Sequence, residues 1–329
     1  MHATLKYTLG SLVAALVATG CANRGAEVTT ALPPMPYPAD NPTSPAKVAL
    51  GAQLFVDKRL SGSGQMACQG CHYRELGWTD ALPLSKRDDG QTNTRHTPSL
   101  YNVGHQSTWY WDGRAATLEG QTLAAWRNQM GADPAKVAAA LNAVPGYASQ
   151  FQVVYGAPAS ADNIVKSLTT YLRTKNSDNA PWDRYERGDN RAVSADAVAG
   201  QKLFMGKGGC VTCHAPPLYG NSTFFNIGLE AGKAKPDIGR LNVSKNEADT
   251  SAFKTPSLRS VALGAPYFHD GSRATLAEAV RYMAGGGGDD PKKSPLLQPT
   301  GLSEPEIAQV VEFLKTLTST EPWQAPKLP

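Results

Sequence analysis

Apolar residues recur at helical spacing in two segments of the chain, one near the middle and one near the end. The spacing is three or four residues in both: Ile164, Leu168, Tyr171 and Leu172 in 160–174, and Ile307, Val310, Val311 and Leu314 in 302–317. A period of 3.6 residues with polar positions between predicts an amphipathic helix in each segment.

Two further helices are predicted upstream of these segments. "SPAKVALGAQLF" (44–55) begins with Ser44 as N-cap and Pro45 at the first helical position, and "SADAVAGQKLF" (194–204) begins with Ser194 as N-cap. Both segments end in Gly-x-x-Leu-Phe. The chain therefore contains two similar helix pairs, each opening and closing one half.

Other landmarks recur in the same order. "TPSL" occurs at 97–100 and at 255–258, and in each half an aspartate follows the threonine by 15 residues, in "WDGRAATLEG" and in "HDGSRATLAEA". Chance does not place this many landmarks in one order, so the chain is an internal duplication. We expect a mainly α protein with two tandem domains, 45–190 and 191–320, each made of a few helices.

The N-terminus predicts an export signal. Lys6 precedes the apolar run "LGSLVAALVATG" (9–20), which is short for a membrane span and typical of a signal peptide within 1–21. The run ends at Cys21 and resembles the lipobox of bacterial lipoproteins, with Ala18 where that pattern prefers leucine. This predicts a periplasmic protein anchored to a membrane through a lipid on Cys21; a cleaved signal and an uncleaved anchor remain alternatives. Residues 22–44 are rich in proline and predict an extended tether.

Composition narrows the class. The 329 residues are 41% hydrophobic and 18% charged, with a formal net charge of +4. These values are ordinary for a soluble globular protein and give no clustered basic surface of the kind that binds nucleic acid. A nucleic-acid partner is therefore not expected.

The cysteines supply the candidate chemistry. Apart from Cys21, they form two C-x-x-C-H motifs, Cys68–Cys71–His72 and Cys210–Cys213–His214. A zinc site needs four ligands close together, and a thioredoxin-like dithiol needs a βαβ context that is missing here. The remaining interpretation is covalent haem c, in which the cysteines bind the porphyrin and the histidine binds the iron. The duplication then predicts two haems, one in each of two tandem cytochrome c-like domains.

The second haem has a candidate sixth ligand. Met283 follows Leu276 by seven residues and lies at the end of a predicted helix, before a glycine run. Its thioether would give the His/Met ligation of electron-transfer cytochromes. A core methionine is the alternative role, and Met205 is the rival ligand.

The first half has Ala125 at the position equivalent to Met283, and alanine cannot bind iron. His96 and His105 remain as candidate ligands there, with Met130 as a further one. We expect the first haem to be open, so that it can bind a small oxidant such as peroxide, for which two haems supply two electrons.

The motifs resemble those of the bacterial dihaem cytochrome c peroxidases and their relative MauG, over roughly residues 45–318. The resemblance rests on both C-x-x-C-H motifs, Met283, "LGWTD" (76–80), "RHTPSLYN" (95–102), "WDGRAATLEGQ" (111–121) and "FKTPSLRSVALGAPYFHDG" (253–271). It implies a peroxidatic haem at His72, a high-potential haem at His214, Trp111 in the electron path between them, and Gln121 in the distal pocket.

The chain departs from that family pattern in four ways. The segment "PLSKRDDGQTN" (83–93) lacks the histidine that caps the resting peroxidatic haem, as in MauG, whereas Met283 stands where MauG has tyrosine. Gln129 replaces the catalytic glutamate, and an amide cannot shuttle a proton. The family's calcium site corresponds to His96 and to the carbonyls of Gly264 and Pro266, and histidine is a poor ligand for calcium.

Three functions follow as hypotheses. The leading one is reduction of hydrogen peroxide with electrons from a small donor cytochrome c or cupredoxin. The second is MauG-like oxidation of a partner protein or organic molecule. The third is a tethered dihaem electron carrier without enzymatic activity, which requires His96 or His105 on the first iron.

Overall fold

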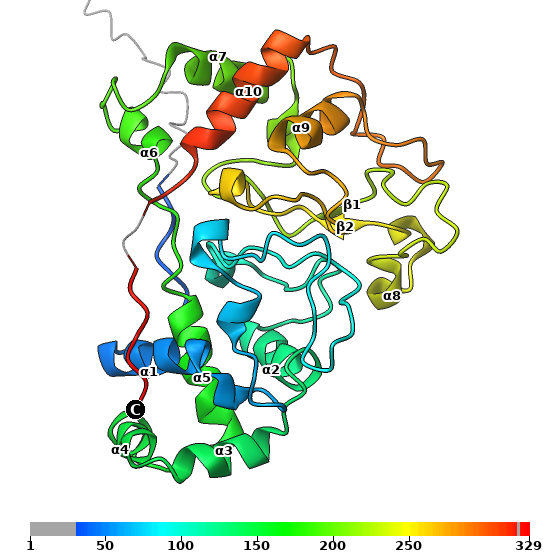
Figure 1. Cartoon of the computed structure of the whole chain (residues 1–329). Coiled ribbons are helices and arrows are strands. Elements are labelled where there is room, and N and C mark those ends of the chain that lie inside the picture. The colour runs from blue at the N-terminus through cyan, green and yellow to red at the C-terminus, as the bar shows by residue number, and fades with distance from the viewer. Residues whose placement is uncertain (1–30, 321–322) are drawn as a thin grey trace, which may run out of the picture.

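A computed structural model describes residues 31–320 and 323–329, and the molecule is mainly helical with two lobes (Figure 1). The predicted signal peptide and Cys21 lie outside the described residues. Within the part of the chain that is described, no helix has the length and apolar character needed to cross a membrane.

The first lobe contains α1–α5 and the second contains α6–α10 with the strands. The helices are α1 (Pro45–Val56), α2 (Leu118–Asn128), α3 (Pro134–Asn142), α4 (Pro145–Tyr155), α5 (Ala161–Leu172), α6 (Pro181–Glu186), α7 (Ala195–Met205), α8 (Leu241–Ser244), α9 (Leu276–Ala284) and α10 (Glu304–Thr316). The strands β1 (Phe224–Phe225) and β2 (Phe253–Lys254) pair antiparallel. Short 3₁₀ turns are η1 (Lys58–Leu60), η2 (Cys68–Gly70), η3 (Arg74–Leu76), η4 (Val103–His105), η5 (Cys210–Thr212), η6 (Glu247–Asp249) and η7 (Val261–Leu263).

The four helices predicted from the apolar pattern and the capping residues are confirmed as α1, α5, α7 and α10. Their first turns are capped as expected: the Ser44 side chain accepts a hydrogen bond from the Lys47 amide, and the Ser194 side chain accepts one from the Ala197 amide. These caps fix where α1 and α7 begin.

In each lobe the helix that contains Gly-x-x-Leu-Phe crosses the last helix of the lobe at the glycine of this motif. A Cβ atom on Gly51 would lie 2.1 Å from the Ser167 carbonyl oxygen, and one on Gly200 would lie 1.8 Å from the Gln309 carbonyl oxygen. Neither distance is possible for a side chain, so only glycine permits these crossings of α1 with α5 and of α7 with α10. The repeated glycine therefore marks the same packing contact in both domains.

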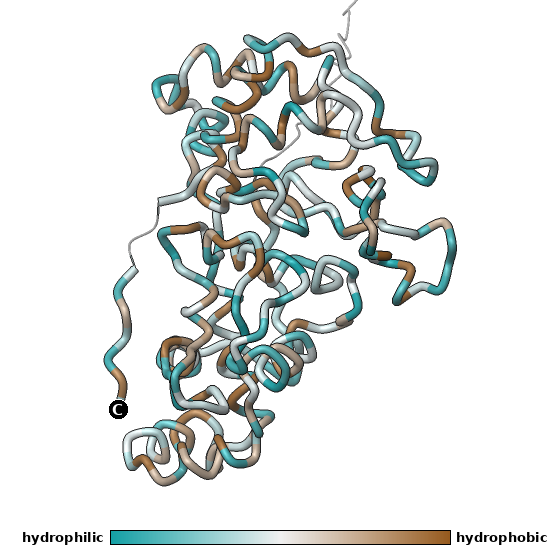
Figure 2. Tube along the Cα trace, turned by 45° about the vertical axis from the view of Figure 1, so that its right-hand side comes forward, coloured by the Kyte–Doolittle hydropathy of each residue, from teal (hydrophilic) through white to brown (hydrophobic). Residues whose placement is uncertain are grey.

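Each lobe has its own hydrophobic core, and apolar residues gather in both (Figure 2). In the second core the ring of Phe313 packs edge-on against Trp182, Phe204 and Tyr219, at centroid distances of 4.9, 5.2 and 5.8 Å. Such aromatic contacts stabilise a core beyond the burial of area alone.

The loops of the two halves repeat as closely as the helices. Tyr110 and Phe268 occupy equivalent positions, and both have left-handed backbone, with φ of 66° and 71°. The lobes meet through these repeated loops in an approximately two-fold manner. The His96 amide donates to the His269 carbonyl at 2.7 Å, and the Lys254 amide donates to the Trp111 carbonyl at 2.8 Å.

The segment before α1 does not behave as an extended tether where it is described. Asn41 is fully buried, and its side-chain amide donates to Glu119 Oε1 at 3.0 Å and to Thr169 Oγ1 at 3.0 Å. Its carbonyl oxygen accepts from Lys47 Nζ. The tether interpretation of 22–44 is therefore wrong around Asn41. The side chain of this residue is buried in the first domain, where hydrogen bonds satisfy both its amide nitrogen and its carbonyl oxygen.

The C-terminal residues 323–329 return to the first domain, and we call them the C-terminal strap (Figure 1). Trp323 Nε1 donates to the Tyr171 hydroxyl at 3.0 Å, and the Trp323 ring packs edge-on against Trp78 at 6.1 Å. Farther along, the Lys327 carbonyl accepts from Gln53 Nε2 at 2.9 Å. The strap thus ties the end of the second domain to the core of the first.

The variant Trp323→Ala is expected to lower the free energy of unfolding of the first domain by about 1–3 kcal/mol, because a half-buried indole loses its ring contact and its hydrogen bond. Urea denaturation followed by far-UV circular dichroism measures this loss. Leu328→Ala is the control, because Leu328 is 44% exposed. Equal effects from the two substitutions would contradict the assigned contact.

Candidate functional site

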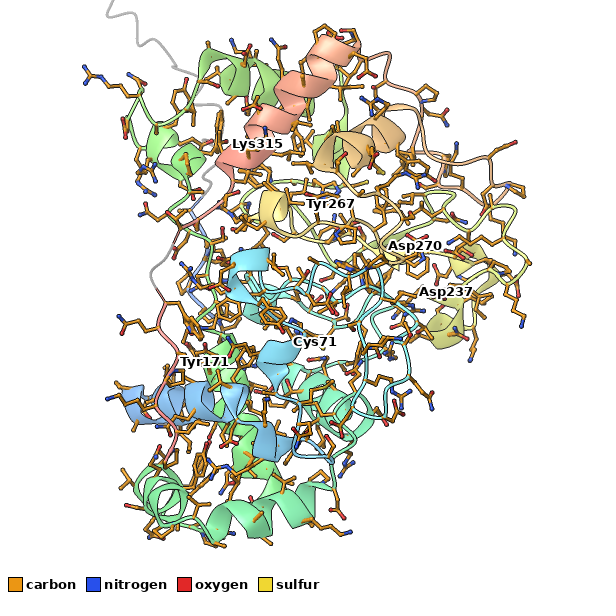
Figure 3. The ribbon with its side chains drawn as sticks, viewed as in Figure 1. Cys71, Tyr171, Asp237, Tyr267, Asp270 and Lys315 are labelled. Carbon is orange, nitrogen blue, oxygen red and sulfur yellow. The ribbon has the colours of Figure 1, made fainter. Side chains whose placement is uncertain are left out.

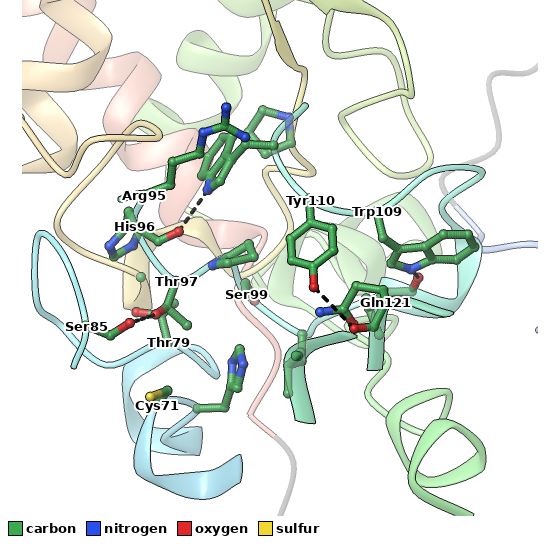
Figure 4. Close-up of a pocket in the computed structure, with 18 of the residues that line it drawn as sticks. Cys71, Thr79, Ser85, Arg95, His96, Thr97, Ser99, Trp109, Tyr110 and Gln121 are labelled. Atoms are coloured by element: carbon green, nitrogen blue, oxygen red, sulfur yellow. Dashed lines mark hydrogen bonds between the residues drawn. The ribbon is translucent and has the colours of Figure 1, made fainter. Parts of the chain in front are cut away.

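A cavity of about 310 Å³ lies where the first domain faces the second, and it gathers the predicted site residues. The predicted residues in its lining are Cys68, Cys71, His72, His96, Trp111, Gln121, Gln129, Gly264 and Pro266. Cys71 lies on the first lobe and Tyr267, another lining residue, lies across from it on the second (Figure 3). Figure 4 shows part of this lining. Residues that are far apart in sequence therefore form one site.

His72 is held in a geometry suited to metal binding. Its Nδ1 lies 2.7 Å from the Trp78 carbonyl oxygen, which fixes the ring and leaves Nε2 free to act as a ligand. Burial lowers the pKa of His72, although the Trp78 carbonyl acts in the opposite direction. The imidazole is therefore neutral at physiological pH, as an iron ligand must be.

His214 repeats this arrangement in the second domain. Its Nδ1 lies 2.8 Å from the Tyr219 carbonyl oxygen, and burial lowers the pKa of its imidazole. The two motifs thus present two imidazoles oriented by backbone carbonyls, each one residue after a cysteine pair.

The cysteines do not fit the competing interpretations. Cys68, Cys71, Cys210 and Cys213 form no disulfide, and burial raises the pKa of Cys68 to about 12. In residues 31–320 and 323–329, the ligand-type side chains that converge on one point are Glu230, His269 and Asp270, none of them a cysteine. The two cysteine pairs lie in separate domains, so a four-cysteine zinc site is excluded.

The residues present fit two covalently bound haem groups. Each C-x-x-C-H motif sits on a 3₁₀ turn, η2 or η5, which places its two cysteines on consecutive turns beside an oriented histidine. At the first motif this group of side chains opens directly into the cavity.

Part of the cavity wall is formed by α2 and the residues that follow it. Gln121, Ala125 and Gln129 line it at intervals of about one helical turn, and the methyl group of Ala125 offers no ligand atom. Met130 also lines the cavity, and its Sδ lies 3.6 Å from Cys68 Sγ, beside the haem attachment point.

The two candidate histidines differ. His105 is not among the residues that line the cavity, whereas His96 is. Nδ1 of His96 lies 2.8 Å from the Leu82 carbonyl oxygen, and its backbone amide is bound to the His269 carbonyl. Burial lowers the pKa of His96, so its ring is neutral. Of the two, His96 alone is near the first site.

Trp111 lies at the contact between the domains. Its indole Nε1 donates to the His96 carbonyl at 2.8 Å, and its carbonyl accepts from the Lys254 amide. Its ring is 6.4 Å from that of His269 in an edge-on arrangement. The position suits the predicted role between the two haems, which stays a prediction.

Met283 lies near the end of α9 and shares a helix face with Leu276 and Val280, which precede it by seven and three residues. Leu276 and Val280 pack against the second core, which Cys210 of the second motif also contacts. Met205 also packs there, at the end of α7. The choice of Met283 as ligand stays a prediction, as does calcium at His96, Gly264 and Pro266.

Sequence reasoning missed several lining residues, among them Tyr110, Arg114 and Lys254. Burial lowers the pKa of Lys254 to about 8, and its Nζ donates to the Thr108 carbonyl at 2.7 Å and to Gln106. The sequence could have indicated Tyr110, because the duplication aligns it with Phe268. The comparison shows that only the first half has a hydroxyl at this position.

The fold and the two histidine sites define a dihaem c-type cytochrome. Residues 45–191 match the family model for di-haem cytochrome c peroxidase, and residues 197–318 match the model for cytochrome c. The chain is 37% identical to the cytochrome-c peroxidase IdrP1 of Denitromonas iodatirespirans, covering 91% of this chain and 89% of that protein. It is 38% identical to the methylamine utilization protein MauG of Methylorubrum extorquens, covering 86% and 81%.

A solved structure agrees with these relatives. A MauG-like protein associated with microbial copper homeostasis superposes with a TM-score of 0.82 at 30% identity, covering 89% of this chain and 95% of that one. The chain therefore belongs to the dihaem cytochrome c peroxidase and MauG family. It is an oxidoreductase of the cytochrome c class with haem c as cofactor, and the expected mainly α fold with two cytochrome c-like domains is confirmed.

Proposed function

We propose that this protein reduces hydrogen peroxide at the His72 site, with electrons that enter through the site of His214 and Met283. The observation that carries the proposal is the cavity beside His72, where α2 and the residue after it contribute Ala125 between two glutamines instead of a ligand. A wall of this kind leaves room for a small oxidant next to the iron position.

The bound haem supplies the redox chemistry of iron when it is present. The chain supplies the rest. The Trp78 carbonyl holds the Nδ1 hydrogen of His72 and so orients Nε2. Gln121 and Gln129 offer amide donors and acceptors that position peroxide or water in the cavity. Reduction of H₂O₂ to two molecules of water consumes two electrons and two protons.

Partners and location belong to the same proposal. The two-electron demand calls for a small one-electron donor, a cytochrome c or a cupredoxin, that docks at the second domain. Peroxide chemistry and covalent haem both fit the bacterial periplasm, with attachment to a membrane through Cys21. A calcium ion between the domains at His96, Gly264 and Pro266 is retained as part of the proposal.

The test mixes the fully reduced holoprotein with stoichiometric peroxide and follows optical and EPR spectra, then turnover with a reduced donor cytochrome. We expect rapid reoxidation and turnover, and we expect Gln129→Glu to change the rate by less than about 10-fold, a small part of the 10²–10⁴ that an essential acid contributes. Gln129→Asn is the matched control that keeps the amide. A silent wild type with an active Gln129→Glu variant would show that this chain does not reduce peroxide.

A second candidate is MauG-like oxidation of a partner protein or organic molecule. It is favoured by Gln129, since the described residues that line the cavity include no aspartate or glutamate. In that case the reoxidised protein would wait for a substrate instead of accepting electrons from a donor cytochrome.

A further inference from the structure

Peroxide reduction needs a proton source beside the cavity, and the amides cannot provide it. Gln121 and Gln129 carry N–H groups that donate hydrogen bonds but do not release protons at physiological pH. The described lining also lacks carboxylic acids. Another side chain must deliver the proton to the oxygen that departs as water.

Tyr110 is placed to do this. Its phenol group enters the cavity from the loop before α2, and its hydroxyl lies 3.3 Å from the Gln121 carbonyl oxygen (Figure 4). This is long for a hydrogen bond between oxygens, whose usual distance is about 2.7–2.8 Å. The bond to the Gln121 backbone carbonyl is therefore weak, and little is lost when the hydroxyl turns toward a molecule bound in the cavity.

Arg114 supports the phenol from the side. Its guanidinium carbon lies 3.6 Å from the centre of the Tyr110 ring, and the guanidinium is anchored by 2.9 Å hydrogen bonds to Asp112. A fixed positive charge against the ring stabilises the phenolate that remains after proton release.

Other ionisable groups of the lining are engaged elsewhere. The Tyr267 hydroxyl donates to the Val261 carbonyl at 3.2 Å, and Lys254 is bound to Thr108 and Gln106. Tyr101 belongs to the buried core of the first domain. His96 is fixed at its Nδ1 by Leu82.

The duplication provides an internal comparison. Phe268 occupies the position of Tyr110 in the second half, on the same left-handed turn, and has no hydroxyl. In the second half, Ala279 occupies the position equivalent to Gln121. The hydroxyl and the amide thus occur together in the first half, whose histidine lines the cavity.

We propose that Tyr110 is a catalytic residue that donates the proton for cleavage of the peroxide O–O bond, in place of a carboxylic acid. This inference rests on the proposed peroxidase function. The O–O bond breaks with two electrons from the reduced protein, and the Tyr110 proton passes to the departing oxygen to form water. The phenolate next to Arg114 then recovers a proton from solvent, and a second proton completes the other water molecule.

The protonation state of the resting protein agrees with this role. Burial raises the pKa of Tyr110 above its usual value of 10, although Arg114 acts in the opposite direction. The phenol therefore holds its proton at neutral pH and has it available for transfer.

The test compares Tyr110→Phe with Tyr155→Phe, both as holoproteins. Tyr155 lies outside the cavity lining, and its hydroxyl is 2.9 Å from Ser167 Oγ. Tyr110→Phe is compatible with the fold, since phenylalanine occupies the equivalent turn at Phe268. We expect peroxide consumption to fall by about 10²–10⁴-fold in Tyr110→Phe and to change by less than about 3-fold in Tyr155→Phe. The double variant Tyr110→Phe/Gln129→Glu is expected to regain most of the lost rate, because it restores an acidic group.

A second readout does not depend on turnover. Carbon monoxide bound to the reduced protein reports hydrogen-bond donors through its C–O stretching frequency, which a donor lowers. We expect this frequency to rise in Tyr110→Phe and to remain unchanged in Tyr155→Phe.

The two readouts separate the possible failures. An active wild type whose Tyr110→Phe variant keeps its rate overturns the role of Tyr110 and leaves the peroxidase function standing. An inactive wild type overturns the peroxidase function; a frequency shift in Tyr110→Phe then still places the hydroxyl against the bound ligand, whereas its absence removes Tyr110 from the site.

Discussion

The variant Met283→His is expected to lower the reduction potential of the second haem by a few tenths of a volt, within the range of about 0.8 V that axial ligands span. A thioether stabilises reduced iron, whereas a second imidazole favours the oxidised state. Met283 shares a face of α9 with Leu276 and Val280, which pack against the core that Cys210 also contacts. Electron supply to the first site then becomes unfavourable, so peroxide turnover falls with the potential.

Potentiometric titration followed by optical spectroscopy measures both haem potentials in one experiment. Met205→Leu is the matched control, because Met205 packs against the same core from the end of α7. We expect it to leave the higher potential within about 0.05 V, since a core substitution of similar volume leaves the ligands in place. A large fall in Met205→Leu together with an unchanged Met283→His would reverse the assignment.

The parts of this structure that were predictable from sequence depend on local signals. Ser44 and Ser194 predict the starts of helices because an N-cap side chain bonds to a backbone amide only three residues later. The C-x-x-C-H motifs carry their whole ligand set within five residues. Even the helix crossings left a local trace, in the glycines Gly51 and Gly200.

The unpredicted parts depend on contacts between segments that are distant in sequence. In the sequence, Asn41 is one polar residue in a proline-rich segment. Only the structure shows that its side-chain amide donates hydrogen bonds to Glu119 and Thr169. The same holds for the strap, since "EPWQAPKLP" contains no repeat or motif that points back to Tyr171. His96 and His105 were equivalent candidates until the cavity separated them.

The largest expected effect on stability comes from breaking the ion pair between Glu119, in the first turn of α2, and the buried Arg173. Glu119 Oε1 accepts hydrogen bonds from Arg173 at 2.6 Å, from Thr169 Oγ1 at 2.9 Å and from Asn41 at 3.0 Å, and the Arg173 side chain is 4% exposed. In Glu119→Ala the guanidinium remains buried without this partner. We expect a loss of about 3–5 kcal/mol in the free energy of unfolding, as for other broken buried pairs.

Acid titration of the same network gives an independent measure. Burial opposes ionisation of Glu119, but hydrogen bonds from Arg173 and Asn41 outweigh it and lower the pKa of Glu119 to about 2, from 4.5. Because the folded-state pKa is depressed, the stabilisation is fully present above about pH 4.5 and is lost as the pH falls toward 2, for a total of about 3 kcal/mol.

Urea unfolding at pH 7, 4.5 and 2.5 resolves this dependence. The wild type should lose more stability than Glu119→Gln between pH 4.5 and 2.5, because the amide has no proton to gain. The control Glu312→Gln removes a largely exposed partner of Lys315 and should follow the wild type. Parallel curves for wild type and Glu119→Gln would contradict the assigned network. Since α2 also carries Gln121 and ends beside Gln129, weakening this network is expected to loosen the distal wall of the cavity before the domain unfolds.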